Sequence, residues 1–360
     1  MIVLALNSGS SSFKFGLFRL DEAHIEELSA TTVANTSTAE AVANVKQFLA
    51  QRGVPAPDAV GHRVVHGGPA LRQHCLLNDS VVQQLEAAVS FAPLHIPPAL
   101  SFIRFAQVQL PGLPQVACFD TCFHTGMPDV ARVLPIPKEL RSAGIQRYGF
   151  HGLSYESILH ELGSDLPDRV VIAHLGNGAS VTAIKKGKSI DTSMGLTPTG
   201  GVIMGTRTGD LDPSVLLYLM REMKFDAVKL AELVDHKSGL LAISGVSSDM
   251  RRLHEAALHN TDAWLAIQMF CYSIGKQIAA MVAVLNGIDL LVFTGGIGEN
   301  DAQVRAEICS RLSWIGICLD EGRNQSAVNP VNSSQSRCVV RVIASQEDEQ
   351  IARHTSAMAG

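Results

Sequence analysis

The chain has 360 residues, of which 46% are hydrophobic and 18% charged. This composition can fill buried cores and excludes a disordered chain, and the length favours two domains. The formal net charge of −5 argues against a nucleic-acid-binding protein, which usually presents a basic face.

Cysteine spacing and hydropathy indicate a cytoplasmic location. The seven cysteines are scattered, with no Cys-x-x-Cys pair, which is typical of thiols in a reducing cytosol. The apolar run at 2–6 has no basic leader before it, so we expect no signal peptide. We also expect no membrane-spanning segment, because no apolar stretch approaches about 18 residues.

Strand-like and helix-like segments alternate along the chain, which is typical of an α/β protein. We predict strands at 2–6, 13–18, 59–65, 115–119, 170–175, 180–184, 290–293 and 339–343. We predict helices at 38–51, 80–90, 98–107, 213–222, 226–234, 261–285 and 301–312.

The first twenty residues predict a β-hairpin. The apolar run at 2–6 leads into the turn Asn7-Ser8-Gly9-Ser10-Ser11-Ser12, and a second alternating run follows at 13–18. This tip offers backbone N–H groups and hydroxyls to an anion, with Lys14 nearby as a positive charge. A plain connecting turn has the same composition, so the hairpin alone leaves both interpretations open.

The same pattern recurs near the middle of the chain, where His174-Leu175-Gly176-Asn177-Gly178-Ala179-Ser180 leads into a second apolar run. Two such hairpins half a chain apart indicate a duplicated fold with one phosphate-facing loop in each half. Chance is the alternative, because hairpins with Gly or Asn tips are frequent. In a duplicated fold, the cleft between the halves would be the ligand site.

Arginine and histidine lie beside glycine at 62–68, 147–152 and 205–210. Arginine next to flexible backbone is typical of a phosphate or carboxylate site, although any one of these residues alone is more often structural. Asp120 directly follows a predicted strand, where it could serve an active site or cap a helix. His62 and His66 fall on a predicted strand, so we expect no zinc site there.

Two common nucleotide-binding motifs are absent. Lys186-Gly187-Lys188-Ser189 looks like the end of a Walker loop, but Thr182 stands where the first glycine is needed. The run Gly295-Gly296-Ile297-Gly298 lacks the third glycine of a dinucleotide fingerprint. It does follow an apolar strand and precede a predicted helix, so a phosphate or a flat ring could approach its backbone.

Taken in order, ten segments resemble the acetate kinase family, of the superfamily of acetate and sugar kinases, heat-shock ATPases and actin. The resemblance covers nearly the whole chain. It implies two duplicated ribonuclease H-like (actin-like ATPase) domains with a cleft between them, an N-terminal one at 1–125 plus 348–360 and a C-terminal one at 126–347. The segments are N-S-G-S-S-S-F-K-F, H-R-V-V-H-G-G, A-P-L-H-I-P-P, F-D-T-C-F-H, R-Y-G-F-H-G, H-L-G-N-G-A-S, D-T-S-M-G-L-T-P, M-G-T-R-T-G-D-L-D-P, S-G-L-L-A-I-S-G-V-S-S-D-M-R and F-T-G-G-I-G-E-N.

The resemblance also implies roles for single residues. Arg63 would bind the acyl carboxylate, Asp120 would be the catalytic acid/base, and His151 and Arg207 would stabilise the transferring phosphoryl group. The remaining implied residues would bind a metal ion (Asn7 and Glu347), an acyl chain (Val65, Leu94, Phe150 and Pro198) and ATP (Lys14, Ser10, Ser12, His174, Leu175, Gly176, Asn177, Gly178, Asp249, Met250, Arg251, Gly296, Ile297, Gly298, Glu299 and Asn300).

The function implied by the resemblance is reversible phosphoryl transfer from ATP to acetate, giving acetyl phosphate and ADP by direct in-line attack. The expected metal ion is Mg²⁺, with Mn²⁺ as an alternative, and the expected assembly is a cytoplasmic homodimer formed through the C-terminal half. We expect acetate as substrate because the bulk of Val65 would crowd a longer chain. Propionate or another short acid is the alternative, and a non-catalytic nucleotide-binding protein is a third hypothesis.

The chain departs from the family pattern at several positions. Ile96 stands where the family usually has Asn, Gly200 where it has Glu, and Tyr155 where a His follows the F-H-G motif. The tail around Glu347 is a looser match, and the segment before His62 is short for the family. The residues assigned to phosphoryl transfer are all present.

Overall fold

The computed structural model describes residues 1–9, 12–21, 24–34 and 37–360. Its strands are β1 Ile2–Ser8, β2 Ser12–Leu20, β3 Ile25–Ala34, β4 Ala59–Val64, β5 Cys75–Leu76, β6 Gln115–Phe119, β7 Arg169–Leu175, β8 Ala179–Lys185, β9 Lys188–Thr192, β10 Leu290–Thr294 and β11 Val339–Val342. Its helices are α1 Thr38–Leu49, α2 Asp79–Ala87, α3 Ile96–Gln109, α4 Asp129–Arg132, α5 Lys138–Ser142, α6 Gly152–Leu162, α7 Pro213–Glu222, α8 Ala227–His236, α9 Gly239–Ser244, α10 Met250–Ala257, α11 Thr261–Leu285, α12 Gly295–Asn300, α13 Ala302–Ser310, α14 Glu321–Ser326 and α15 Glu347–Ala359.

The strands form two sheets of related topology. The first sheet has the order β3-β2-β1-β4-β6-β5, and the second has the order β11-β10-β7-β8-β9. In each sheet an antiparallel hairpin (β1–β2 or β7–β8) is extended on one side by a third antiparallel strand and on the other by parallel strands. The fold is therefore duplicated, and the recurring hairpin in the sequence marks the start of each half.

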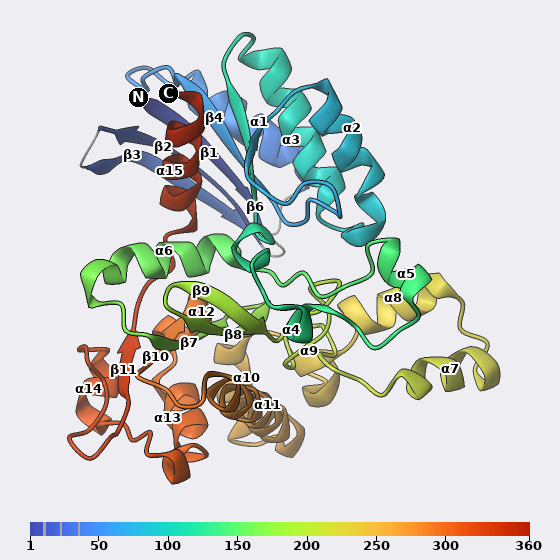
Figure 1. The fold of residues 1–360 in the computed structure, drawn as a ribbon, viewed down its shortest axis with the longest axis vertical. Helices are drawn as coiled ribbons and strands as arrows, with labels where there is room; N and C mark the ends of the chain where they lie inside the picture. The colour runs from blue at the N-terminus through green and yellow to red at the C-terminus, as the bar shows by residue number, and fades with distance from the viewer. Residues whose placement is uncertain (10–11, 22–23, 35–36) are drawn as a thin grey trace.

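Buried apolar runs explain why these strands form the centre of each sheet. The five residues from Val3 to Asn7 in β1 are all buried, and β10 is buried throughout. A strand with both faces covered favours a continuous apolar run over alternation. Helices α1 and α3 pack near the first sheet, and α11 packs against β7, β8 and β9 of the second (Figure 1).

The last helix returns to the first sheet. Helix α15 packs against β1, β2, β4 and β6, and the two chain ends lie close together (Figure 1). Ile351 and Ala352 of this helix join Val3 and Ala5 of β1 in one buried apolar cluster. The segment that follows β11 therefore crosses from the second sheet to the first.

Helix α11 is long and apolar enough to cross a membrane by length and composition alone. Ten of its residues are nevertheless buried against the protein, including Phe270, Ile274 and Ile278, which belong to the core around the second sheet. The core thus accounts for one face of this helix, while Trp264, Leu265 and Tyr272 on it are exposed. The seven cysteines are all free thiols.

Several elements were not predicted. The sequence interpretation missed the strands β3, β5 and β9 and the helices α4, α5, α6, α9, α10, α14 and α15. Strand β3 is mixed in composition and, from 25 to 33, its residues are half-buried or exposed, so it lacks the buried apolar run of the predicted strands. Helix α15 begins with three acidic residues, Glu347, Asp348 and Glu349, which stabilise a helix N-terminus but also look like a polar tail.

Candidate active site

Three predicted site residues lie at the same edge of the first sheet. Asn7 is at the end of β1, Arg63 is near the end of β4, and Asp120 directly follows β6. These three strands run parallel and adjacent, so their carboxyl ends meet at one edge. That edge is where open α/β folds usually bind their ligands.

Arg63 is the centre of a hydrogen-bonded network. Its Nε and Nη2 donate to the Asp120 carboxylate at 3.1 and 2.7 Å, and its Nη1 donates to Asn7 Oδ1 and Glu347 Oε2, both at 2.9 Å. Asn7 Nδ2 in turn donates to Glu347 at 3.1 Å and to Asp348 at 2.6 Å. One Nη2 hydrogen of Arg63 has no acceptor among the described residues.

The network holds more negative than positive charge. Burial raises the pKa of Asp120, although Arg63 opposes the shift, and burial also raises the pKa of Asp348. Burial alone would raise the pKa of Glu347 as well, but Arg63 and His174 reverse that shift and lower it. Buried Asp120 and half-buried Glu347 and Asp348 face one guanidinium, and Lys14 also acts on Glu347 and Asp348, so the carboxyl groups still outnumber the positive charges and favour a further cation.

The donor set of this network fits Mg²⁺. Carboxylate and amide oxygens are the protein ligands that this ion takes, and Asn7, Glu347 and Asp348 supply them within one hydrogen-bonded group. Asn7 and Glu347 are the two predicted metal residues, and the structure brings them together. Asp348 was not predicted as a ligand, because the C-terminal motif was matched only at Glu347.

Arg207 and His151 converge on the loop between β7 and β8. A Cβ atom added at Gly178 would lie 3.3 Å from both Arg207 Nη1 and His151 Nε2, so these two nitrogens border the same small space. His151 adopts a left-handed backbone conformation (φ 60°) directly before α6. The glycine keeps this space open for another group.

The Arg207 guanidinium is buried but carries no ion pair within the described ranges. Its contacts are the Pro198 carbonyl at 3.3 Å, His95 Nε2 at 3.4 Å and the Met204 sulfur at 3.9 Å. Burial lowers its pKa, and Asp235 acts on it only at longer range. A buried cation without a counter-ion is a strong candidate for an anion-binding group.

His151 is neutral near pH 7, because burial and then nearby His174, Arg63 and Arg207 lower its pKa well below the usual range. Its ring stacks on that of His174, with centroids 4.2 Å apart. His174 accepts or donates a hydrogen bond at Ser154 Oγ (2.8 Å). His174 is thus placed beside His151 rather than in the pocket described next.

A pocket of about 930 Å³ lies in the second half and is bordered by three predicted ATP segments. Eight of the predicted ATP residues line it: Gly176, Asn177, Asp249, Met250, Arg251, Gly296, Ile297 and Asn300. Sequence reasoning missed the other lining residues: Ser247, Ser248, Arg252, His254, Asp301, Ala302, Gln303 and Gln325.

Other predicted ATP residues lie elsewhere. Leu175 is fully buried in the core. Glu299 Oε1 accepts hydrogen bonds from the backbone N–H groups of Gly295 (2.9 Å) and Ser345 (3.0 Å), so it joins β10 to the crossing segment. Gly178 borders the space beside Arg207 and His151, and Lys14 lies opposite Asn7 across the β1–β2 hairpin.

Two further ATP predictions are not described by the structure: Ser10 and the side chain of Ser12 lie outside the described positions.

The last predicted ATP residue, Gly298, is buried in α12. The turn before it depends on Gly295, which has φ 77° and where a Cβ would come within 2.8 Å of the Leu175 carbonyl oxygen. No L side chain would fit there without strain.

The predicted acyl-chain residues are brought together only in part. Val65 and Phe150 are buried in the same apolar cluster, and Pro198 touches Arg207 through its carbonyl. Leu94 is 45% exposed, next to His95, which contacts Arg207. The structure therefore groups Val65 with Phe150, and Pro198 with Arg207, but gives Leu94 no contact with this set among the described residues.

A model of the acetokinase family matches residues 29–353. The chain belongs to the acetokinase family. It is 40% identical to the acetate kinase of Heliobacterium modesticaldum over 99% of this chain and 98% of that protein. It is 42% identical to the acetate kinase of Brachyspira hyodysenteriae over 99% of each.

Solved structures agree with this acetokinase assignment. A propionate kinase from Francisella tularensis has a TM-score of 0.91 and 36% identity, covering 99% of each chain. The acetate kinase of Porphyromonas gingivalis has a TM-score of 0.87 and 34% identity, covering 100% of each chain. The resemblance drawn from the ten segments is thus confirmed, as is the duplicated actin-like ATPase fold.

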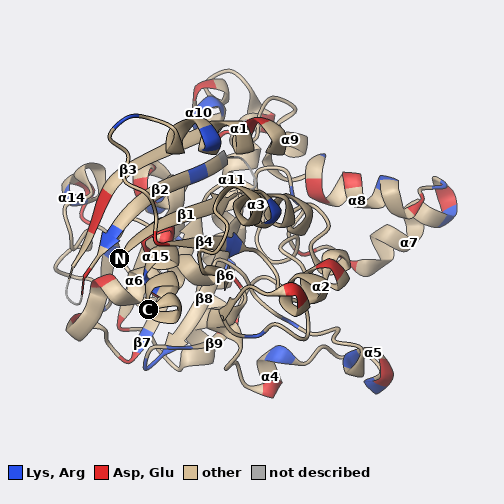
Figure 2. Ribbon diagram, turned by 90° about the horizontal axis from the view of Figure 1, so that it is seen from above, with Lys and Arg blue, Asp and Glu red and all other residues tan. Residues whose placement is uncertain are grey.

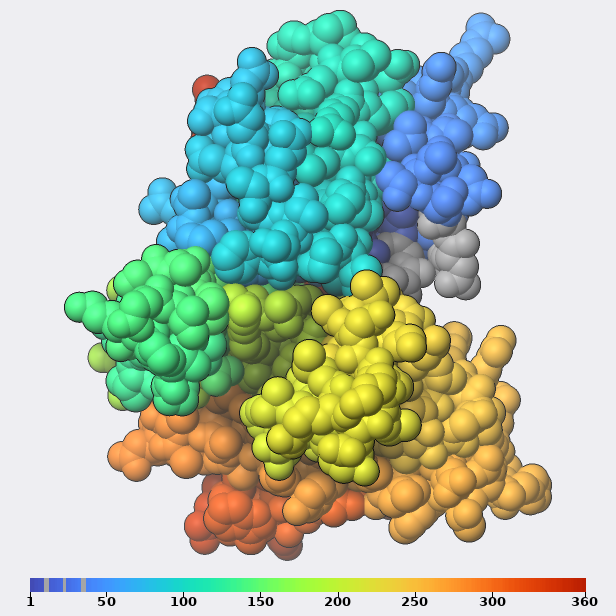
Figure 3. All heavy atoms as spheres, turned by 90° about the vertical axis from the view of Figure 1, so that its right-hand side faces the viewer, coloured from blue at the N-terminus to red at the C-terminus, as the bar shows by residue number. Residues whose placement is uncertain are grey.

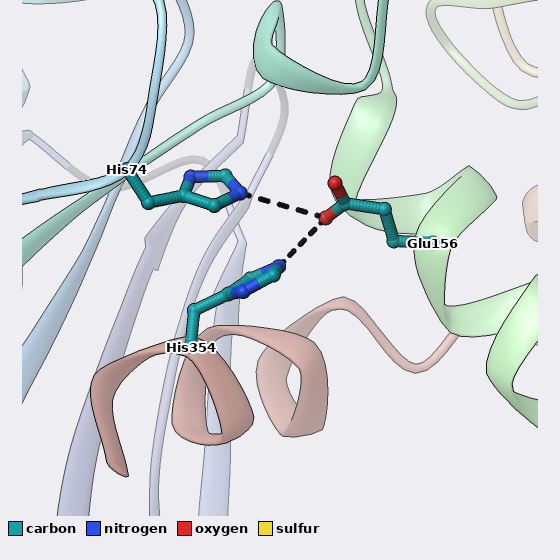
Figure 4. A group of neighbouring side chains, drawn as sticks. All are labelled: His74, Glu156 and His354. Atoms are coloured by element: carbon teal, nitrogen blue, oxygen red, sulfur yellow. Dashed lines mark hydrogen bonds and ion pairs between the residues drawn. The ribbon is translucent and has the colours of Figure 1, made fainter. Parts of the chain in front are cut away.

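A second group of ligating side chains lies away from the acetokinase site. His74, Glu156 and His354 come from the loop before β5, from α6 and from α15 (Figure 4). His354 Nε2 is 2.7 Å from Glu156 Oε2, and His74 Nε2 is 3.7 Å from the same oxygen. His74 Nδ1 accepts the Phe119 N–H at 3.0 Å, so the ring proton is on Nε2, the atom that would face a metal. This arrangement favours a hydrogen-bonded contact between the halves over a metal centre.

We expect Glu156→Gln to destabilise the fold. Burial alone would raise the Glu156 pKa, but hydrogen bonds and charge from His354 and His74 lower it to about 2. A carboxyl whose pKa is depressed on folding stabilises the protein above its unfolded pKa, and that gain is lost as pH falls from about 4.5 towards 2. The loss on substitution at pH 7 should be about 1.5–3 kcal/mol.

Thermal unfolding followed by circular dichroism at pH 7.5 and pH 4 measures this effect. The melting temperature of the variant should be lower by a few degrees at pH 7.5, and the deficit should shrink at pH 4. Glu161→Gln, an exposed position on the same helix, is the matched control. Equal melting temperatures for Glu156→Gln and wild type at pH 7.5 would contradict the stabilising role assigned to Glu156.

Proposed function

We propose that this protein is an acetate kinase, a phosphotransferase with a carboxyl group as acceptor. The observation that carries the proposal is the pair of arginines near His151: Arg207, which has no ion pair within the described ranges, and Arg63, which is bound to carboxylates. Arg207 with His151 offers a site for an anion, and Arg63 keeps one donor for a carboxylate. A kinase that acts on a short acid needs both.

The two halves place these groups opposite each other. Arg63 and Asp120 belong to the first sheet, whereas His151 and Arg207 border the β7–β8 loop of the second. In the space-filling view the surface is hollowed between the bodies formed by the two halves (Figure 3). We propose that 1–125 with 348–360 form the N-terminal domain and 126–347 the C-terminal domain, a division supported by the packing of α15 on the first sheet.

Arg63 would orient the acid through its free Nη2 hydrogen, and one acetate oxygen would attack the γ-phosphorus in line with the bond to ADP. As the new O–P bond forms, the bond to the ADP oxygen breaks. Acetate arrives ionised, so no proton has to leave the nucleophile. Catalysis then depends on positioning and on stabilising charge on the transferring group, which Arg207 and His151 would do.

Asp120 would act mainly through Arg63. Its carboxylate accepts from both Nε and Nη2 of that guanidinium, which fixes the plane of the fork. Its raised pKa keeps the predicted acid/base role as an alternative, although direct transfer to an ionised acid moves no proton at the nucleophile. The orienting role is the one that the bidentate contact supports.

Asn7 and Glu347 would hold Mg²⁺, with Mn²⁺ as an alternative, directly or through water. The support is the oxygen donor set and the excess of carboxyl groups around Arg63. A bound divalent ion supplies charge neutralisation to the ATP phosphates. Lys14, which faces Asn7 across the first hairpin, would add a positive charge beside the same phosphates.

The nucleotide would occupy the pocket in the second half. That pocket opens between the β7–β8 turn, the start of α10 and α12, and the Gly176 and Gly296 backbones form part of its wall. A Cβ at Gly296 would meet nothing within 4 Å, so this backbone is open to a ligand. The pocket is lined by Gly176 and Asn177, which directly precede Gly178. A nucleotide in the pocket would therefore point its phosphates towards the space between Gly178, Arg207 and His151.

Acetate is the proposed acid, and propionate is the alternative, as in the neighbouring Francisella tularensis structure. We expect kcat/KM for acetate to exceed that for propionate by about ten-fold or more, because the extra methylene would meet buried Val65 and Phe150. Trapping the acyl phosphate with hydroxylamine, at limiting concentrations of each acid, measures the ratio. A ratio below one would assign the protein to propionate.

The same assay tests the function as a whole. Acyl hydroxamate that depends on ATP, Mg²⁺ and acetate is the expected result. ATP binding without product from acetate, propionate or butyrate would favour the third hypothesis, a non-catalytic nucleotide-binding protein. The free donor of Arg63 argues against that hypothesis, since a nucleotide alone does not need it.

We further propose a cytoplasmic homodimer formed through the C-terminal half, with no membrane or nucleic-acid partner. Helices α7 and α8 project from the body (Figure 1), and no residue of either helix is buried. Such exposed apolar surface is typical of a protein interface. Helices α5 and α8 carry charges of both signs, and α7 ends in Arg221 and Glu222 (Figure 2), which does not favour nucleic acid. The exposed apolar side chains on α7 and α11 are Val215, Leu217, Tyr218, Met220, Trp264, Leu265, Met269, Tyr272 and Val284.

A further inference from the structure

A buried chain of hydrogen bonds leads to His151 from the side away from the cleft. The Tyr155 hydroxyl is 2.5 Å from Ser180 Oγ, and Ser180 Oγ is 2.8 Å from His151 Nδ1. Tyr155 and Ser180 are both fully buried. The opposite ring nitrogen, Nε2, borders the space beside Arg207 Nη1 and Gly178.

The tyrosine ring is held in place by its neighbours. Phe123 and His124 pack against it, with ring centroids 5.8 and 5.7 Å away. The Tyr155 backbone N–H also donates to the His151 carbonyl at 3.1 Å, in the first turn of α6. The distance between the hydroxyl and Ser180 is therefore set by packed elements, α6 on one side and β8 on the other.

The proton positions follow from the donors available. A phenol is a better hydrogen-bond donor than an alcohol, and Ser180 Oγ lies 2.5 Å from the Tyr155 hydroxyl. The Thr182 hydroxyl is a second hydrogen-bonding neighbour of the phenol and also pairs with Thr192 Oγ1 at 2.8 Å, whereas Ser180 is the neighbour that reaches His151. When Tyr155 donates to Ser180, the Ser180 proton points to His151 Nδ1, and the imidazole carries its proton on Nε2.

We propose that Tyr155, acting through Ser180, is a positioning residue that holds His151 in the tautomer with the proton on Nε2. In this tautomer His151 presents an N–H donor, rather than a lone pair, to a negatively charged group beside Arg207. The inference rests on the proposed function in one respect, that the group is the transferring phosphoryl. A lone pair on Nε2 would repel that group. The tautomer therefore decides whether His151 stabilises or destabilises the transferring phosphoryl group.

The tautomer itself can be read without any turnover. Long-range ¹H–¹⁵N correlation spectra of the ¹⁵N-histidine-labelled, ligand-free protein at pH 7.5 distinguish a protonated from an unprotonated ring nitrogen. The His151 signals are assigned by their absence in His151→Gln. We expect protonated Nε2 and unprotonated Nδ1 in the wild type, and gain of protonated Nδ1 in Tyr155→Phe and Ser180→Ala.

Tyr148→Phe is the matched control, because it also removes a buried phenol hydroxyl, whose hydrogen bond goes to the Gly144 carbonyl at 2.9 Å. Its His151 tautomer should be that of the wild type. A wild-type His151 with protonated Nδ1 would overturn the proposal. An unchanged tautomer in Tyr155→Phe would overturn it equally.

Kinetics provide a second, independent readout. We expect kcat to fall about tenfold or more in Tyr155→Phe, with KM for ATP and acetate changed little, and at least as far in Ser180→Ala. Because Tyr155 acts through Ser180, the double variant should be no slower than Ser180→Ala alone. Independent, multiplying losses would show that Tyr155 has only a structural role and would contradict the proposal.

The two readouts separate this inference from the proposed function. If the tautomer changes as expected but the wild type forms no acyl phosphate, the proposed function fails and the positioning of His151 stands. If the wild type is active and Tyr155→Phe keeps both tautomer and kcat, the positioning role fails and the proposed function stands.

Discussion

Replacing Arg207 with alanine is expected to lower acetate kinase turnover by about a hundredfold or more without destabilising the fold. Removing one donor that acts on charge developing in the transition state costs about 10²–10³ in kcat. The side chain is buried without an ion pair within the described ranges, so its removal also takes an uncompensated charge out of the interior. The melting temperature should therefore equal or exceed that of the wild type.

The measurement is kcat for acetyl phosphate formation at saturating ATP and acetate, together with thermal unfolding of the same samples. Arg104→Ala is the matched control, since this arginine forms an exposed pair with Glu86 on the outside of the first half. It should leave kcat unchanged. Turnover of Arg207→Ala within threefold of the wild type would contradict the role assigned to Arg207.

Replacing Arg63 with alanine should also lower turnover by about a hundredfold or more, but with the opposite effect on stability. Arg63 donates to Asp120, which is buried, and to Glu347, which is half-buried. Without the guanidinium they would lie close together with no counter-ion, a strongly unfavourable arrangement. The melting temperature should fall, in contrast to that of Arg207→Ala.

A second variant separates lost catalysis from lost stability. In Arg63→Ala combined with Asp120→Asn, one of the unneutralised charges is gone, so the melting temperature should recover in part while turnover stays low. The measurements are the same kcat and thermal unfolding. Recovery of turnover along with stability would mean that Arg63 only holds the fold together.

The sequence was sufficient to predict the centre of each half. The runs at 2–6 and 290–293 are continuous and apolar because those strands are buried on both faces, and such runs are readable without a structure. The strands of the second hairpin, at 174–184, are also mostly buried and apolar, so the hairpin pattern could be read a second time and predicted the duplication. Glycines at the strand ends predicted where backbone lines the pocket.

The charge balance of the site could not be predicted in this way. Asp210 and Asp212 follow Arg207 closely in the sequence, yet Asp210 accepts the Gly201 N–H at 2.7 Å and Asp212 caps α7 at Ser214. Arg63 instead pairs with Glu347, 284 residues away. The pairing of acids with arginines depends on how elements distant in sequence pack together. That Arg207 has no ion pair within the described ranges could therefore be learned only from the structure.

The departures from the family pattern have different consequences. Ile96 is fully buried in the core of the first half, where an apolar side chain is well accommodated. At Gly200 a Cβ would lie 3.3 Å from Asp210 Oδ1, and nothing else in the structure explains the change from Glu. Tyr155 reaches Ser180 and, through it, His151. Of these three departures, only Tyr155 bears on the proposed phosphoryl transfer, because it is linked through Ser180 to His151.

The most direct test of the account is ³¹P NMR of the purified protein with Mg-ATP and acetate. The account predicts that the γ-phosphate resonance of ATP declines as those of acetyl phosphate and ADP grow, and that adding acetyl phosphate to Mg-ADP produces ATP. The Arg207→Ala variant at equal concentration should show neither change on the same time scale. Release of inorganic phosphate alone, or unchanged ATP in the presence of the wild-type protein, would contradict the claim that this cleft transfers phosphate to a carboxylate.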